Sequence, residues 1–161
     1  MTKKSYITQI FIEEKGLPVP TPEIQHERNL AIYDILQENQ FSLAEKLGNH
    51  EHYGPYSITL SLKNSLLHWL IEDQTSNLKY ELHLSLTPLR AIIKDYFEIC
   101  NSYFNAVKRL PPSQIETIDM GRRGIHLEGG KALIERLGGK ASTDVPTAKR
   151  LFTLVCALHF K

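Results

Sequence analysis

The middle of the chain alternates apolar and polar residues with a period of two. From Tyr56 to Leu62 every second residue is apolar, and the residues between them are serine or threonine. This alternation predicts a strand with one buried face, because successive side chains of a strand point to opposite sides of a sheet. The pair Asn64-Ser65 then predicts a two-residue turn, and a second turn is expected within residues 74–77.

These two turns determine the register of a three-stranded antiparallel meander. The first turn places Leu60 opposite Trp69 and Ile58 opposite Ile71, and the second places Trp69 opposite Leu82. Both registers keep one apolar face intact, which a slip of one residue would turn toward solvent. Weaker alternation over residues 6–12 predicts a fourth strand.

Two Thr-Pro pairs predict helix starts. Thr21-Pro22 combines a hydroxyl cap with a proline at the first helical position, and this helix is expected to end near Glu38. Thr87-Pro88 repeats the signal and opens a longer helix. That helix carries a heptad-like apolar seam, made of Leu89, Ile93, Tyr96, Cys100, Tyr103, Val107 and Leu110. We interpret it as a core helix lying across the meander, with a dimer interface along part of the seam as the alternative.

Three further helices are predicted in the last third of the chain. Pro111-Pro112 should stop the long helix, and a capping box formed by Ser113 and Glu116 should open the next one, which is expected to end at Gly121. Another helix is expected from about residue 125 to 138, and a last one from about residue 144. The apolar run at residues 151–158 predicts that the last helix is central to the packing, although alternation alone would also fit a buried strand.

The order of elements is therefore β-α-β-β-β followed by several helices. This order indicates an α+β class, in which an antiparallel meander sheet is packed by a long helix. A chain of 161 residues fits one domain, so residues 1–161 are taken as a single α+β domain.

Charge and composition exclude several classes of protein. Residues 1–80 carry 7 basic and 10 acidic side chains and residues 81–161 carry 12 and 8, so the second half has a net charge of only +4. This is too small to support nucleic-acid binding. We see no apolar leader and no run of the roughly 20 apolar residues that a membrane span needs, so a cytoplasmic location is expected. Cys100 and Cys156 lie in apolar runs and are expected to be buried free thiols.

Four segments of the chain resemble a known family. They are HERNLAIYDILQEN, LSLTPLRAIIKDYFEIC, PSQIETIDMGRRGIHLEG and TAKRLFTLVCALHF, and together they cover most of the chain from about His26 to Phe160. They are similar to a family of small alphaproteobacterial proteins that is described only as an uncharacterised protein family with no assigned function. The resemblance implies a bacterial cytoplasmic protein and supplies no activity, cofactor or catalytic residue.

The stretch DMGRRGIHLEGG, residues 119–130, is the candidate site. A helix ending near Met120 and another beginning near Ile125 would leave a loop with free backbone N–H groups at the positive end of a helix dipole. Two guanidinium groups and an imidazole would complete an anion site. Its ligand-binding residues would be Gly121, Arg122, Arg123, Gly124 and His126. The alternative is that the glycines are helix caps and that the arginines pair with Asp119, Glu116 or Glu128.

Two classes of function follow from this candidate site. The first is a binding or regulatory module that recognises a phosphate- or carboxylate-bearing ligand or partner through the loop 119–128. A homo-oligomer is expected for this class. The second is a small enzyme that acts on a phosphorylated or carboxylated metabolite with His126 as acid/base. The first is preferred because neither an acid/base pair nor a nucleophile–base pair can be assembled from the sequence. No cofactor is predicted.

The remaining histidines have no assigned role. His50 and His52 form a His-x-His motif, the meander register places His68 opposite His83, and His26 lies beside Glu27 and Arg28 in a polar, exposed helix start. A cross-strand histidine pair can bind a metal or share a proton, but a polar outer sheet face is the simpler interpretation. Neither pair has a third ligand in the sequence, so no metal site is predicted.

Overall fold

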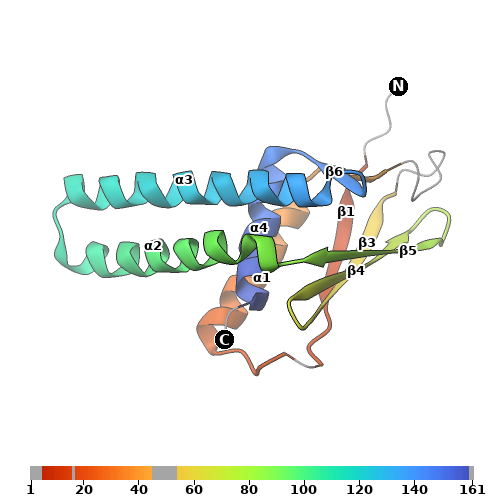
Figure 1. Ribbon diagram of the computed structural model, residues 1–161, viewed down its shortest axis with the longest axis horizontal. Helices are drawn as coiled ribbons and strands as arrows, with labels where there is room; N and C mark the ends of the chain where they lie inside the picture. The colour runs from red at the N-terminus through yellow and green to blue at the C-terminus, as the bar shows by residue number, and fades with distance from the viewer. Residues whose placement is uncertain (1–4, 16, 45–53, 160–161) are drawn as a thin grey trace.

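The computed structural model describes residues 5–15, 17–44 and 54–159. Its main sheet has four strands in the order β1-β3-β4-β5 (Figure 1). The strands are β1 (Ile7–Ile12), β3 (Tyr56–Lys63), β4 (Leu66–Asp73) and β5 (Lys79–Ser85). The last three form the predicted antiparallel meander, and β1 pairs in parallel with β3 at the edge.

The register of the meander is the one that the sequence predicts. Leu60 lies opposite Trp69, and Trp69 lies opposite Leu82. The turn between β3 and β4 has Asn64 and Ser65 at φ 50° and 65°, the left-handed conformation that a two-residue hairpin turn requires. The predicted α+β fold class is therefore confirmed.

In the described part of the chain, four α-helices accompany the sheet. They are α1 (Pro22–Gln37), α2 (Arg90–Arg109), α3 (Pro112–Leu137) and α4 (Val145–His159), and a short 3-10 turn, η1 (Thr87–Leu89), precedes α2. Figure 1 shows α2 and α3 side by side as a hairpin that extends away from the sheet, with α1 and α4 crossing at its base. None of the described helices is long and apolar enough to cross a membrane.

A second, two-stranded sheet was not predicted. Strand β2 (Phe41–Leu43) pairs antiparallel with β6 (Ala141–Thr143), which joins the segment after α1 to the segment before α4. Each strand has three residues, too few for a period-two pattern to show in the sequence. Phe41 is buried and stacks on Trp69 with 6.2 Å between the ring centres, so this small sheet closes one end of the core.

Helix α4 is the central helix of the core, as its apolar run predicts. Seven of the eight residues from 151 to 158 are buried, and Thr153 is half-buried. Helix α2 joins this core mainly through Ile93 and through Leu89 of the preceding turn, both 1% exposed. Further along the seam Val107 is 53% exposed, and α2 runs beside α3 away from the sheet (Figure 1), so this helix does not lie across the meander as expected.

The predicted break at Gly121 is wrong. Helix α3 runs without interruption from Pro112 to Leu137, and Pro111 is its N-cap without a side-chain hydrogen bond, so the predicted capping box at Ser113 is also wrong. A glycine inside a helix costs about 1 kcal/mol relative to alanine. Tertiary packing of α3 against α2 and α4 outweighs this cost.

Candidate functional site

The continuous helix changes what residues 119–128 can offer to a ligand. Their backbone N–H groups lie inside α3, where such groups bond to carbonyls one turn earlier and are not available to an anion. The expected loop with free N–H groups is therefore wrong. What remains is a set of side chains on a helix, where residues three or four apart share a face.

Arg122 and His126 share the face of α3 that turns toward α2 and α4. The other three residues of the predicted site, Gly121, Arg123 and Gly124, are exposed. A Cβ atom added to Gly124 would meet nothing within 4 Å. The structure thus divides the predicted site into a partly buried pair and an exposed group.

Arg122 is held by two contacts. Its Nη2 and Nε donate to Oδ1 of Asp119 at 2.6 and 3.1 Å, and its guanidinium carbon lies 4.5 Å from the ring centre of Tyr103 on α2. Hydrogen bonding from Arg122 is the main cause that lowers the pKa of Asp119. Such a cation–π contact adds to the ion pair and links α3 to α2.

Arg123 contacts the same carboxylate from the solvent side. Its Nε lies 3.2 Å from Oδ2 of Asp119, and its side chain is 64% exposed. Two guanidinium groups therefore share one carboxylate, which is one of the pairings given above as the alternative to an anion site. Arg122, Arg123 and Asp119 together carry a formal charge of +1.

His126 contacts residues of α2 and α4 in the interior of the fold. Its Nε2 lies 2.8 Å from the carbonyl oxygen of Lys149 and 2.7 Å from Oγ1 of Thr153, both on α4. Its ring stacks on Tyr96 with 5.3 Å between ring centres. Burial lowers the pKa of His126; the hydrogen bond with the backbone of Lys149 opposes this, and the charges of Lys149 and Arg122 add to it. The lowered pKa favours the neutral ring at pH 7. Because a carbonyl oxygen only accepts, Nε2 carries the single proton and donates it.

Three residues of the cluster around His126 were not predicted as part of a site: its neighbours Tyr96 and Thr153, and Cys100, which contacts Tyr96. The hydroxyl of Tyr96 is within hydrogen-bonding reach of the Cys100 thiol and of Thr153, and burial raises its pKa well above the usual range. Burial also raises the pKa of Cys100. The seam of α2 put Tyr96 and Cys100 one turn apart on one face, but nothing local indicated that α3 and α4 meet them there.

The polar helix start in α1 is only partly exposed. His26 is exposed as expected, but Arg28 is 2% exposed, so its predicted exposure is wrong. Its Nε donates to the carbonyl of Ala157 at 3.3 Å near the end of α4. Desolvation is the main influence on this guanidinium and lowers its pKa, against the charge of Glu14. A cation at a helix C-terminus complements the helix dipole, which accounts for this position.

The other histidines do not join the cluster at α3. His68 and His83 lie opposite each other on β4 and β5, as predicted, with 4.3 Å between ring centres. His50 and His52 lie outside the described residues. Within residues 5–15, 17–44 and 54–159, no group of three or more His, Cys, Asp or Glu side chains is placed to hold a metal ion.

These features first define a class: an α+β domain in which a mixed sheet is closed by helices and a polar cluster lies where α2, α3 and α4 meet. Sequence comparison then identifies the family. The model of the Uncharacterised protein family (UPF0262) matches residues 4–161, and the chain belongs to this family.

Relatives in this family match almost end to end. A UPF0262 protein of Roseobacter denitrificans is 53% identical over 97% of this chain and 98% of its own length. One of Ruegeria pomeroyi is 54% identical over 97% of both chains, and one of Paracoccus denitrificans is 50% identical over 94% of both. The resemblance to an alphaproteobacterial family is therefore confirmed. No solved structure matches the chain.

Proposed function

We propose that this protein is a binding module that recognises an anionic group, a phosphate or a carboxylate, at the ridge of α3 formed by Arg122 and Arg123. The observation that supports this is the sharing of one carboxylate, that of Asp119, by both guanidinium groups. The ridge keeps one unbalanced positive charge. The contact of Arg123 with Asp119 uses Nε, so its two terminal amino groups take no part in that ion pair, and the side chain is 64% exposed. Such a guanidinium can make a bidentate contact with an anion.

The same cluster favours binding over catalysis. His126 is neutral and donates its one proton to a backbone carbonyl, so it must break a structural hydrogen bond before it can exchange that proton with a substrate. Burial raises the pKa of the Cys100 thiol, which keeps it in the unreactive protonated form. An acid/base role for His126 is therefore the second choice, as it was from sequence.

Thermal unfolding in the presence of inorganic phosphate tests this proposal. Phosphate that binds only the folded protein should raise the melting temperature, and added sodium chloride should reduce the rise by screening. Arg123→Ala should abolish the rise without loss of stability, because exposed arginines contribute little. Arg136→Ala, an exposed arginine on the same helix, is the matched control and should respond like the wild type.

A second variant should strengthen phosphate binding rather than abolish it. Asp119→Asn removes the carboxylate that competes with the ligand, so phosphate should raise the melting temperature more than it does in the wild type. Repeating the series with a glutamate-rich peptide distinguishes a free phosphate ligand from an acidic protein partner. If phosphate and peptide both leave wild-type melting unchanged, or if Arg123→Ala keeps the full response, the proposal is wrong.

A further inference from the structure

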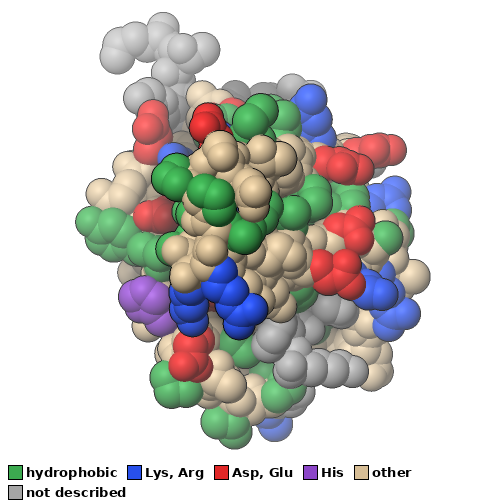
Figure 2. Space-filling view, turned by 90° about the vertical axis from the view of Figure 1, so that its left-hand side faces the viewer, with side chains coloured by type: hydrophobic (Ala, Val, Ile, Leu, Met, Phe, Trp, Pro, Cys, Tyr) green, Lys and Arg blue, Asp and Glu red, His purple; other side chains and the backbone are tan. Residues whose placement is uncertain are grey.

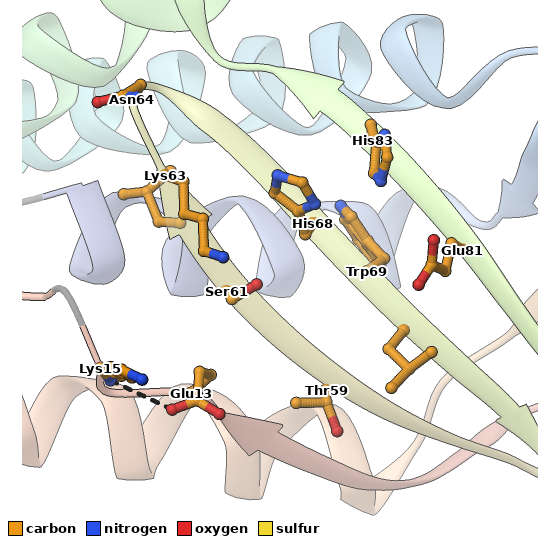
Figure 3. A pocket seen from close by; sticks show the side chains of 12 residues that line it. Glu13, Lys15, Thr59, Ser61, Lys63, Asn64, His68, Trp69, Glu81 and His83 are labelled. Atoms are coloured by element: carbon orange, nitrogen blue, oxygen red, sulfur yellow. Dashed lines mark hydrogen bonds between the residues drawn. The ribbon is translucent and has the colours of Figure 1, made fainter.

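The outer face of the main sheet carries a second group of side chains, separate from the helical cluster. His68 on β4 pairs with Ser61 on one side and with His83 on the other, so the three side chains share one face. This face lies opposite the one formed by Trp69 and the core. Figure 3 shows the two imidazole rings beside each other on this side of the sheet.

A pocket of about 700 Å³ lies over this histidine pair. Oxygen donors line it beside the imidazoles, among them Ser61, Thr59 and the carboxylate of Glu81, which precedes His83 by two residues on the same side of β5 (Figure 3). Two lysines and two glutamates line the pocket, so it has no net charge that would repel a cation. Figure 2 looks onto the end of the helical hairpin and shows a group of Lys and Arg side chains below the centre of that face.

The backbone beneath the pair is held in place. Both histidines lie inside a regular antiparallel ladder, and Nζ of Lys140 donates to the carbonyl oxygen of His83 at 2.9 Å. A rigid ladder keeps the two imidazoles together without the loss of backbone entropy that a flexible loop would incur on binding.

The separation of the rings is close to that of two ligands on one metal ion. With metal–nitrogen bonds of about 2.0–2.1 Å, two imidazoles at a right angle on one ion have ring centres roughly 4.5 Å apart, and wider angles place them farther apart. The observed distance between ring centres is 4.3 Å, so the rings must move slightly apart to hold one ion at a right angle. A right angle between neighbouring ligands is typical of the tetragonal geometry that Cu²⁺ and Ni²⁺ prefer with nitrogen and oxygen donors.

We propose that His68 and His83 bind a divalent first-row metal ion, Cu²⁺ or Ni²⁺, on the outer face of the sheet. Because the described residues do not supply a third His, Cys, Asp or Glu ligand in place, the site is open, and water or an oxygen donor from a bound molecule fills the other positions. The ion is therefore exchangeable and is not needed for folding. This proposal departs from the sequence analysis, which predicted no metal site; the ring geometry and the pocket above the pair are what the structure adds.

Calorimetric titration of tag-free protein with CuCl₂ and with NiCl₂ tests this site. We expect one ion per chain, and His68→Gln and His83→Gln should each lower the affinity by at least about tenfold. The double variant His50→Gln/His52→Gln removes the His-x-His motif and should bind like the wild type. All variants should melt like the wild type without metal, because the pair lies on the outer face of the sheet.

Electron paramagnetic resonance of the Cu²⁺ protein gives an independent readout that needs no variant. The spectrum should show coupling to two imidazole nitrogens in a tetragonal field. Unchanged affinity in either His68→Gln or His83→Gln, loss of binding in the His50/His52 double variant, or a spectrum without nitrogen coupling would each overturn the proposal.

Discussion

A Cβ atom added to Gly129 would lie 2.5 Å from the ring of Phe152, because α3 and α4 pack closely at this point. The next residue, Gly130, is also confined: its added Cβ would lie 2.9 Å from Cγ and 3.1 Å from the backbone nitrogen of Lys149. The glycine pair is therefore what allows α4 to approach α3 and brings Lys149 and Thr153 within reach of His126.

We predict that Gly129→Ala destabilises the protein by about 1–3 kcal/mol, because the methyl group overlaps the fully buried ring of Phe152. Gly124→Ala is the matched control on the same helix. Nothing lies within 4 Å of its added Cβ, so it should stabilise by about 0.5–1 kcal/mol through the better helix propensity of alanine. Urea unfolding of both variants measures this, and effects of the same sign would contradict the assigned packing.

Stability should fall in mildly acidic solution because of His126. Burial lowers the pKa of this ring in the folded protein, so the unfolded chain takes up the proton first as the pH falls below about 6.5. The contribution is fully present above that pH and is lost toward the lower folded pKa. His126→Gln has no such proton, so its stability should change less between about pH 7.5 and 5.5 than that of the wild type. His26→Gln, an exposed histidine, is the control, and equal pH slopes for His126→Gln and the wild type would refute the prediction.

Asp73 should be needed for the turn between β4 and β5. Its buried carboxylate accepts hydrogen bonds from the backbone N–H groups of Thr75, Ser76 and Gly54 at 2.9, 3.2 and 3.2 Å. Asp73→Ala leaves these donors without their partner and should cost about 2–4 kcal/mol of unfolding free energy. Asp34→Ala, at an exposed position, should change stability little. Denaturant unfolding compares the two, and equal losses would show that the carboxylate network is not responsible.

The two thiols should react slowly and in a fixed order. Cys156 is 2% exposed and Cys100 is half-buried, and burial raises the pKa of both, which lowers the fraction of reactive thiolate. In native protein treated with iodoacetamide, mass spectrometry should find Cys100 modified first and Cys156 protected, whereas both react quickly in urea. Modification of Cys156 at the rate of Cys100 would contradict its place in the core.

The sequence alone determined the meander and its register. Period-two alternation indicates which side of a strand is buried. Given the positions of the turns, only one register keeps Leu60, Trp69 and Leu82 on one face. The start of α1 at Thr21-Pro22 is equally local, and Oγ1 of Thr21 accepts from the N–H of Ile24 as a capping hydroxyl should. These features depend on residues within a few positions of one another, so they can be predicted without the tertiary structure.

Only the tertiary structure decided the course of α3 and the neighbours of His126. Local rules interpret Gly121 and Gly124 as helix ends, but α2 and α4 pack along α3 and hold it as one helix. The same packing brings Tyr96 from α2 and Thr153 from α4 to His126. Such contacts join residues far apart in the sequence, and their energy comes from the burial of whole helix faces, which no short pattern of residues records.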